Sequence, residues 1–104
     1  MNLVTAILLP DGRLDVFPQD LTVARGSVVT WQFSCPDYPD HPGQIHWHLD
    51  FAAPRAIGGN NGRLASDNGS LAFTATDPGD WKYAVQAYLN GIMVGEDDPY
   101  LHIR

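Results

Sequence analysis

Turn-forming residues interrupt this chain so often that a long helix has no place in it. Proline, glycine and aspartate recur between short runs of β-forming residues, such as the run from Val28 to Ser34. Of the 12 acidic residues only Glu96 is a glutamate, and of the 6 basic residues only Lys82 is a lysine. Aspartate favours turns, whereas glutamate and lysine favour helix interiors. The sequence therefore predicts an all-β protein.

The β-forming runs are short and separated by turns, which is typical of a sandwich. A chain of 104 residues has room for one core, so we expect a single domain over residues 1–104. Two long loops are expected, at 35–43 and at 52–70, the second with a short helical turn near 54–57. A shorter connection is expected at 91–95. We expect about seven or eight strands, at 2–9, 13–17, 21–25, 28–34, 44–51, 71–76, 81–89 and 99–104.

Apolar residues alternate with polar ones along these runs, and alternate side chains on a strand point to opposite faces. One face of each strand can therefore fill the space between two packed sheets. We expect Trp31, Trp47 and Trp81 to be largely buried on these faces. The predicted fold is a two-sheet antiparallel Greek-key sandwich, whose core-facing residues are Val29, Trp31, Phe33, Ile45, Trp47, Leu49, Phe51, Leu71, Phe73, Ala75, Trp81, Tyr83, Val85, Ala87, Leu89, Leu101 and Ile103.

The stretch LTVARGSVVTWQF, at 21–33, reads as a strand, a glycine turn and a V-x-W-x-F strand, and in this order it resembles the cupredoxin family. The stretch DPGDWKYAVQAYLNGIMVG, at 77–95, resembles its C-terminal Pro-Gly-x-Tyr-x-Tyr phrase, which leads to Cys, His and Met copper ligands. The resemblance implies a cupredoxin-like sandwich. Bacterial immunoglobulin-like domains share the second phrase, so an immunoglobulin-like sandwich stays an alternative.

The copper ligands that this resemblance implies are mostly replaced. Val85 stands at the position of the thiolate ligand and Tyr88 at that of the second histidine, while Met93 matches the weak axial methionine. A blue-copper centre needs a thiolate and two imidazoles, and valine has no ligating atom. We therefore expect a cupredoxin-like scaffold without a type 1 copper site.

A histidine pair is the sharpest local feature of the sequence. His46, His48 and Asp50 share one face of an expected strand, and the two imidazoles lie about 6.6 Å apart along it. That spacing lets both imidazoles reach one zinc or copper ion, with Asp50 or His41 as a third ligand. The alternative is that the histidines lie on the solvent-exposed face of the strand without binding metal, while their neighbours fill the core. We expect no bound cofactor, and keep this metal site as the alternative hypothesis.

Charge and cysteine content limit the remaining function classes. The net charge of -6 and the scattered arginines disfavour nucleic acid and anionic membranes as partners. Cys35 is the sole cysteine, so no internal disulfide forms, and the N-terminal segment lacks the basic start of a signal peptide. These features predict a cytoplasmic protein. Catalysis by Cys35 with His41 lacks any recognisable motif.

The predicted function is a small non-catalytic binding module. The sequence contains a complete pattern of core residues, but it contains no complete set of catalytic residues. The loop at 52–70 is long for a compact domain, and long loops on a rigid scaffold often bind partners. We expect a protein partner at that loop. The sequence does not specify the oligomeric state.

Overall fold

The computed structural model describes residues 2–35, 45–51, 63–66 and 69–104, and these residues contain strands and turns but no helix. The predicted all-β class is confirmed. The strands are β1 (Asn2–Leu8), β2 (Leu14–Phe17), β3 (Asp20–Val23), β4 (Val28–Ser34), β5 (Ile45–Phe51), β6 (Arg63–Ser66), β7 (Ser70–Thr74), β8 (Gly79–Leu89), β9 (Ile92–Asp97) and β10 (Tyr100–Ile103).

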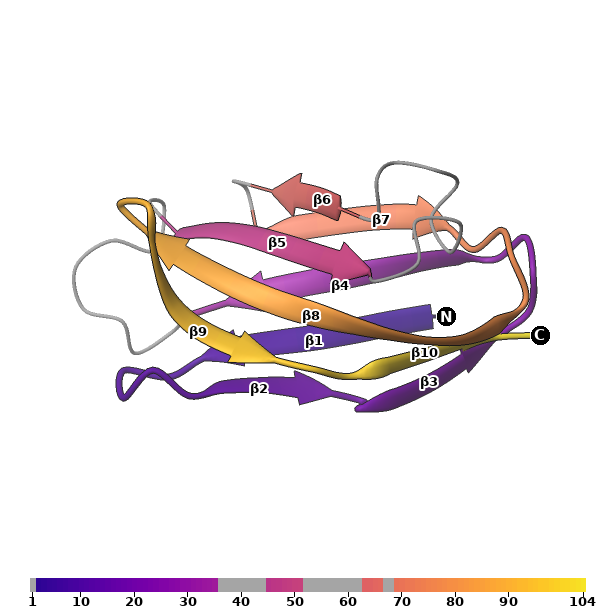
Figure 1. The fold of residues 1–104 in the computed structure, drawn as a ribbon, viewed down its shortest axis with the longest axis horizontal. Helices are drawn as coiled ribbons and strands as arrows, with labels where there is room; N and C mark the ends of the chain where they lie inside the picture. The colour runs from indigo at the N-terminus through magenta and orange to yellow at the C-terminus, as the bar shows by residue number, and fades with distance from the viewer. Residues whose placement is uncertain (1, 36–44, 52–62, 67–68) are drawn as a thin grey trace.

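The strands form two sheets that pack face to face (Figure 1). One sheet has four strands in the order β2-β1-β4-β7, and the other runs β3-β10-β8-β5-β6, with β9 also paired to β8. The predicted sandwich is therefore confirmed. Its sheets are mixed rather than wholly antiparallel, because β1 runs parallel to β4 and β3 runs parallel to β10. A parallel pair joins segments distant in sequence, which local alternation does not encode.

Two of the ten strands were missed from sequence. β9 covers most of the expected connection at 91–95, and β6 lies within the expected loop at 52–70. Asn90 and Gly91 have φ values of 53° and 80° and join β8 to β9. An Asn-Gly pair with positive φ is the preferred two-residue hairpin turn, so the sequence did carry this signal. The short β6 has too few residues to show a period. The helical turn expected near 54–57 lies outside the described residues.

The core lies between the two sheets, and Trp31 occupies its centre. The Trp31 ring is fully buried, stacks on Phe73 with ring centroids 5.1 Å apart, and meets Tyr83 edge-on at 5.7 Å. Its indole Nε1 donates a hydrogen bond to the Tyr83 hydroxyl over 3.2 Å. Because Trp31 belongs to β4 and Tyr83 to β8, this contact joins the two sheets. Burial raises the pKa of Tyr83 well above its usual value.

Burial of the three tryptophans follows the prediction at Trp31 and Trp47 but not at Trp81. Trp47 is 2% exposed, whereas Trp81 is only partly buried at the margin of the core. The indole Nε1 of Trp81 donates to the Asp77 carbonyl over 3.0 Å. A Cβ at Gly79 would lie 2.8 Å from the Trp81 ring, so the ring lies directly over this glycine. Trp81 thus covers the turn before β8 instead of entering the core.

We expect Tyr83→Phe to destabilise the protein more than the same change at an exposed tyrosine. The substitution leaves the buried Trp31 Nε1–H without its acceptor, which costs about 1–3 kcal/mol. Urea unfolding monitored by tryptophan fluorescence measures the loss. Tyr100→Phe is the matched control, because Tyr100 is 40% exposed, and a surface change of this kind alters stability by about 0.5 kcal/mol or less. Equal losses in the two variants would contradict the importance of this hydrogen bond.

Candidate functional site

The histidine pair lies on the outer face of β5, as its spacing predicts. His46 is exposed, whereas His48 and Asp50 are half-buried, and the residues between them face the core. Opposite them on β8, the Cα partner of His46 is Tyr88 and that of His48 is Gln86. The rings of His48 and Tyr88 meet edge-on, with centroids 4.9 Å apart. The pair therefore belongs to a continuous polar surface across β5 and β8.

The metal-site hypothesis needs a third ligand beside His46 and His48. Among the residues that the structure describes, no three His, Cys, Asp or Glu side chains lie together so as to hold a metal ion. His41, the proposed ligand from the preceding loop, lies outside the described residues. The metal site consequently stays a prediction.

Cys35 is buried directly after β4, as a small apolar residue would be. Burial raises the pKa of its thiol. The thiolate is the nucleophilic and metal-binding form of cysteine, so this environment works against both roles. The suggested partner of Cys35 in catalysis, His41, lies outside the described part of the chain.

The positions that the cupredoxin resemblance links to copper do not converge. Val85 is fully buried and faces the core, whereas Tyr88 lies on the outer face of the same strand. Where the resemblance implies a ligand-bearing loop, β8 and β9 form a hairpin closed by Asn90 and Gly91. Met93 is 46% exposed. These residues do not fit a type 1 copper site, because they supply neither a thiolate nor an imidazole and point in different directions.

The end of this hairpin instead presents apolar side chains to solvent. Ile92 is 68% exposed and Met93 is 46% exposed, although both directly follow a well-paired turn. Further along the strand, β9 packs closely on β1 of the four-stranded sheet, because a Cβ at Gly95 would lie 2.6 Å from Leu8 Cδ1. The hairpin is therefore a firmly supported element with an exposed apolar end.

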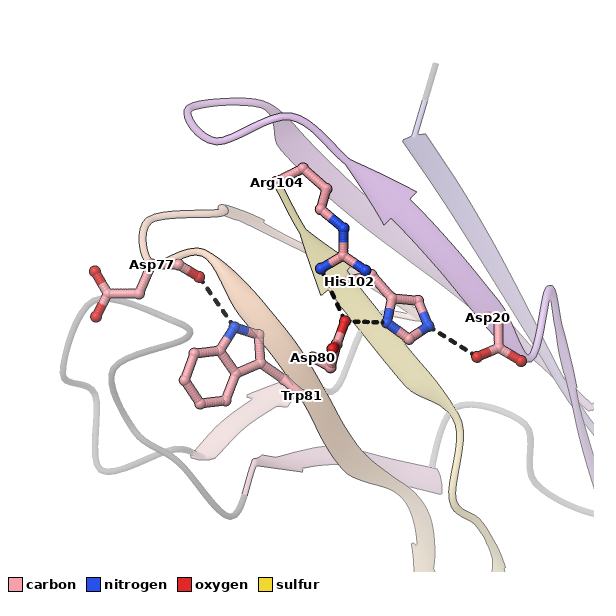
Figure 2. Close-up of polar contacts among 6 residues, drawn as sticks. All are labelled: Asp20, Asp77, Asp80, Trp81, His102 and Arg104. Atoms are coloured by element: carbon pink, nitrogen blue, oxygen red, sulfur yellow. Dashed lines mark hydrogen bonds and ion pairs between the residues drawn. The ribbon is translucent and has the colours of Figure 1, made fainter.

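A charged cluster that sequence reasoning missed joins three strands of the larger sheet (Figure 2). The imidazole of His102 on β10 lies between two carboxylates, with Nδ1 2.7 Å from Asp80 Oδ1 and Nε2 2.9 Å from Asp20 Oδ1. Arg104 Nη1 lies 2.8 Å from Asp80 Oδ1. Asp20 and His102 are 82 positions apart in sequence. No local pattern indicates such a cluster.

The geometry gives His102 a structural role. The pKa of His102 is raised mainly by its hydrogen bond to Asp20 and next by its hydrogen bond to Asp80. The pKa of Asp80 is lowered by the hydrogen bonds that it accepts, mainly from His102 and next from Arg104. When His102 is protonated, both ring nitrogens donate to these carboxylates, and neither nitrogen is free to accept a substrate proton. Figure 2 shows the two carboxylates on opposite sides of the ring, so they do not converge on one ion. The cluster ties the edge strand β3 to β10 and β8.

One shallow depression lies beside this surface. It has a volume of about 200 Å³ and is lined by Asp50, Lys82, Tyr83, Ala84 and Asp98. Ligand sites for small molecules usually enclose about 300–1,000 Å³ and are mainly apolar. This depression is smaller than such sites and open to solvent, so it does not enclose a small molecule.

Comparison with known proteins establishes the fold. No protein-family model and no curated protein matches the sequence. Solved cupredoxin structures do match, and three of them illustrate the similarity. A purple cupredoxin from Nitrosopumilus maritimus is similar over 100% of both chains, with a TM-score of 0.58 and 13% identity. Dithionite-reduced auracyanin from Roseiflexus castenholzii is similar over 100% of this chain and 98% of its own, with a TM-score of 0.57 and 12% identity.

The third match is oxidised plastocyanin from Dryopteris crassirhizoma, over 96% of this chain and 99% of its own, with a TM-score of 0.54 and 14% identity. The chain is thus a cupredoxin-like β-sandwich, which confirms the predicted resemblance. The three matches lend no support to the immunoglobulin-like alternative. Identities this low establish the fold alone. In the described segments, no helix exists that is long and apolar enough to cross a bilayer.

We expect stability to fall as pH rises above about 6.5 because of His102. Its pKa in the folded state is raised above the ordinary value of about 6.5. The cluster therefore stabilises fully below that value, and its contribution is lost as pH rises through the higher folded-state pKa. Urea unfolding across this range should show the decline in wild type. The decline should be weaker in His102→Gln. The same decline in His102→Gln would contradict the role given to this cluster.

Copper(II) added to the purified protein should produce no intense blue or purple absorption. Such absorption requires a thiolate ligand held with imidazoles, and Val85 occupies the position of that ligand. Visible spectroscopy with stoichiometric copper tests this. Cys35→Ser should give the same spectrum as wild type. An intense band that disappears in Cys35→Ser would show that this thiolate binds copper after all.

Proposed function

Taking the cupredoxin-like fold as the scaffold, we propose that this chain is a non-catalytic protein-binding module. Its contact surface is the apolar end of the β8–β9 hairpin, formed by Ile92 and Met93. The observation that carries the proposal is their exposure, 68% and 46%, on a hairpin that replaces the ligand-bearing loop implied by the resemblance. The same region of the scaffold would thus present side chains to a partner rather than to a metal.

The physical properties of this hairpin suit a binding site. Apolar side chains that become desolvated at the centre of an interface carry much of its binding energy. A firmly held hairpin also loses little conformational freedom on association, which reduces the cost of binding. Tyr88, the Cα partner of Met93, extends the surface onto β8 with a half-buried aromatic ring. Aromatic residues and methionine are both enriched in the cores of protein interfaces.

The absence of catalysis belongs to the proposal as well. The imidazole of His102 is hydrogen-bonded at both nitrogens to carboxylates. The described thiol, Cys35, is buried and has a raised pKa. Each group is therefore better suited to stabilising the fold than to proton transfer or nucleophilic attack. A cytoplasmic location and the lack of a nucleic-acid partner remain predictions from charge and cysteine content.

The loop at 52–70 was the contact site expected from sequence. Most of it lies outside the described residues, and its described strand β6 pairs with β5 instead of projecting from the sheet. The hairpin end offers exposed apolar side chains in a defined position, so the proposal rests on it. Binding through the remainder of that loop stays a prediction.

A photo-crosslinking competition experiment tests the hairpin surface. A photoreactive phenylalanine analogue at Ile92 should capture a defined partner protein in cells. Purified wild-type domain in excess should abolish the crosslink by competition, because it occupies the same site on the partner. The Ile92→Asp, Met93→Asp double variant should fail to compete, since two carboxylates cannot be buried unpaired at an interface.

The matched control carries the same change at an apolar residue elsewhere. Val28→Asp alters a side chain that is 56% exposed on β4, away from the hairpin, and it should compete as wild type does. Circular dichroism confirms that each variant is folded. Competition by the double variant at wild-type strength would overturn the assignment of the binding surface.

A further inference from the structure

Charged side chains are distributed very unevenly between the two outer faces of the sandwich. On the outer face of the four-stranded sheet, Asp15 is the sole charged residue among the outward positions of the described strands β2, β1, β4 and β7. It lies at the edge, paired with Arg13 over 3.5 Å. The opposite sheet carries the His102 cluster together with Asp50, Lys82 and Glu96. Among the described strands, little of the protein's net charge of -6 therefore lies on this face.

The uncharged face combines apolar and small polar residues. β1, which lies in the interior of the sheet, presents half-exposed Leu3, Thr5 and Ile7, because Val4 and Ala6 point to the core. Phe17 and Val28 are 57% and 56% exposed on neighbouring strands. The other outward residues are Thr30, Gln32, Ser34, Ser70, Ala72 and Thr74. We name this surface the neutral face.

We propose that the neutral face binds a second copy of this chain, giving a two-fold dimer in which the two four-stranded sheets pack against each other. Sheets of this kind pack face to face at about 10 Å, with their strands rotated by about 30°. A two-fold interface places the same patch of each copy in contact. The neutral face tolerates this arrangement because it brings no like charges together, whereas contact through the other face would oppose acidic clusters.

The size of the neutral face determines the expected affinity. The four strands have 7, 4, 7 and 5 residues in the order β1, β2, β4, β7. With about 3.3 Å per residue and about 4.8 Å between strands, they cover roughly 360 Å² per copy. Two such faces bury about 730 Å² in total, which is at the low end of interface sizes, where weak and transient complexes lie. Standard interfaces of about 1,600 Å² have micromolar dissociation constants at their weakest. We therefore expect a dissociation constant weaker than about 1 µM and a dimer that forms at high protein concentration.

Sedimentation equilibrium over a wide range of protein concentration tests the dimer. The weight-average mass should rise from the monomer value of 11.4 kDa toward twice that value. Added salt should strengthen the association, because it screens the repulsion between two acidic copies. Thr30→Arg places a cation near the middle of the neutral face and should abolish the rise. Phe17→Ser, which removes apolar area without adding charge, should weaken association several-fold.

Two controls separate this interface from other effects. Ala84→Arg adds the same charge to the opposite sheet and should dimerise as wild type. The Ile92→Asp, Met93→Asp variant should also dimerise normally, so the dimer and the proposed partner surface can fail independently. Circular dichroism and thermal unfolding establish that each variant is folded. A monomer at every concentration, or dimerisation of Thr30→Arg at wild-type strength, would overturn the proposal.

Discussion

The packing of Trp31 between the two sheets is the interaction on which the rest of the structure depends. The ring is fully buried, stacks on Phe73 within its own sheet, and donates a hydrogen bond to the Tyr83 hydroxyl of the opposite sheet. Phe51 then stacks on Tyr83 with centroids 4.7 Å apart. An aromatic series thus crosses the core from one sheet to the other. These contacts hold the two sheets together at the aromatic part of the core.

On this scaffold, the proposed function depends on which side chains lie at the connection between β8 and β9. β8 presents Val85 to the core and Tyr88 to the outer face, and an Asn90-Gly91 turn returns the chain directly into β9. A tight hairpin leaves no loop in which ligands could surround a metal. The hairpin leaves Ile92 and Met93 exposed, and the proposed binding surface rests on that exposure.

The two outer faces differ in whether their polar side chains are charged. On the larger sheet, His102 joins Asp20 and Asp80, so the short edge strand β3 is held by charge as well as by backbone pairing. On the smaller sheet, hydroxyl, amide and apolar side chains replace the charges. Because the described strands of this sheet carry one outward charge, Asp15, two copies of a protein with a net charge of -6 would meet there with little repulsion, as the proposed dimer requires.

The sequence by itself determined the elements whose signals are local. Alternation predicted the central strands and the burial of Trp31 and Trp47, and the short motifs predicted the cupredoxin-like fold and the loss of ligating atoms at Val85. The Asn90-Gly91 turn was equally local, and its hairpin was predictable although it was missed. The partial exposure of Trp81 was not predictable, because it depends on how its ring lies over Gly79.

Only the tertiary structure decided the parallel pairing of β1 with β4 and of β3 with β10, and the cluster around His102. These features join residues far apart in the chain, as with the 82 positions between Asp20 and His102. A period of two tells which side chains share a face of one strand, but it carries no information about which strand lies beside it. The neutral face has the same origin, because it exists only once four separate strands are aligned in one sheet.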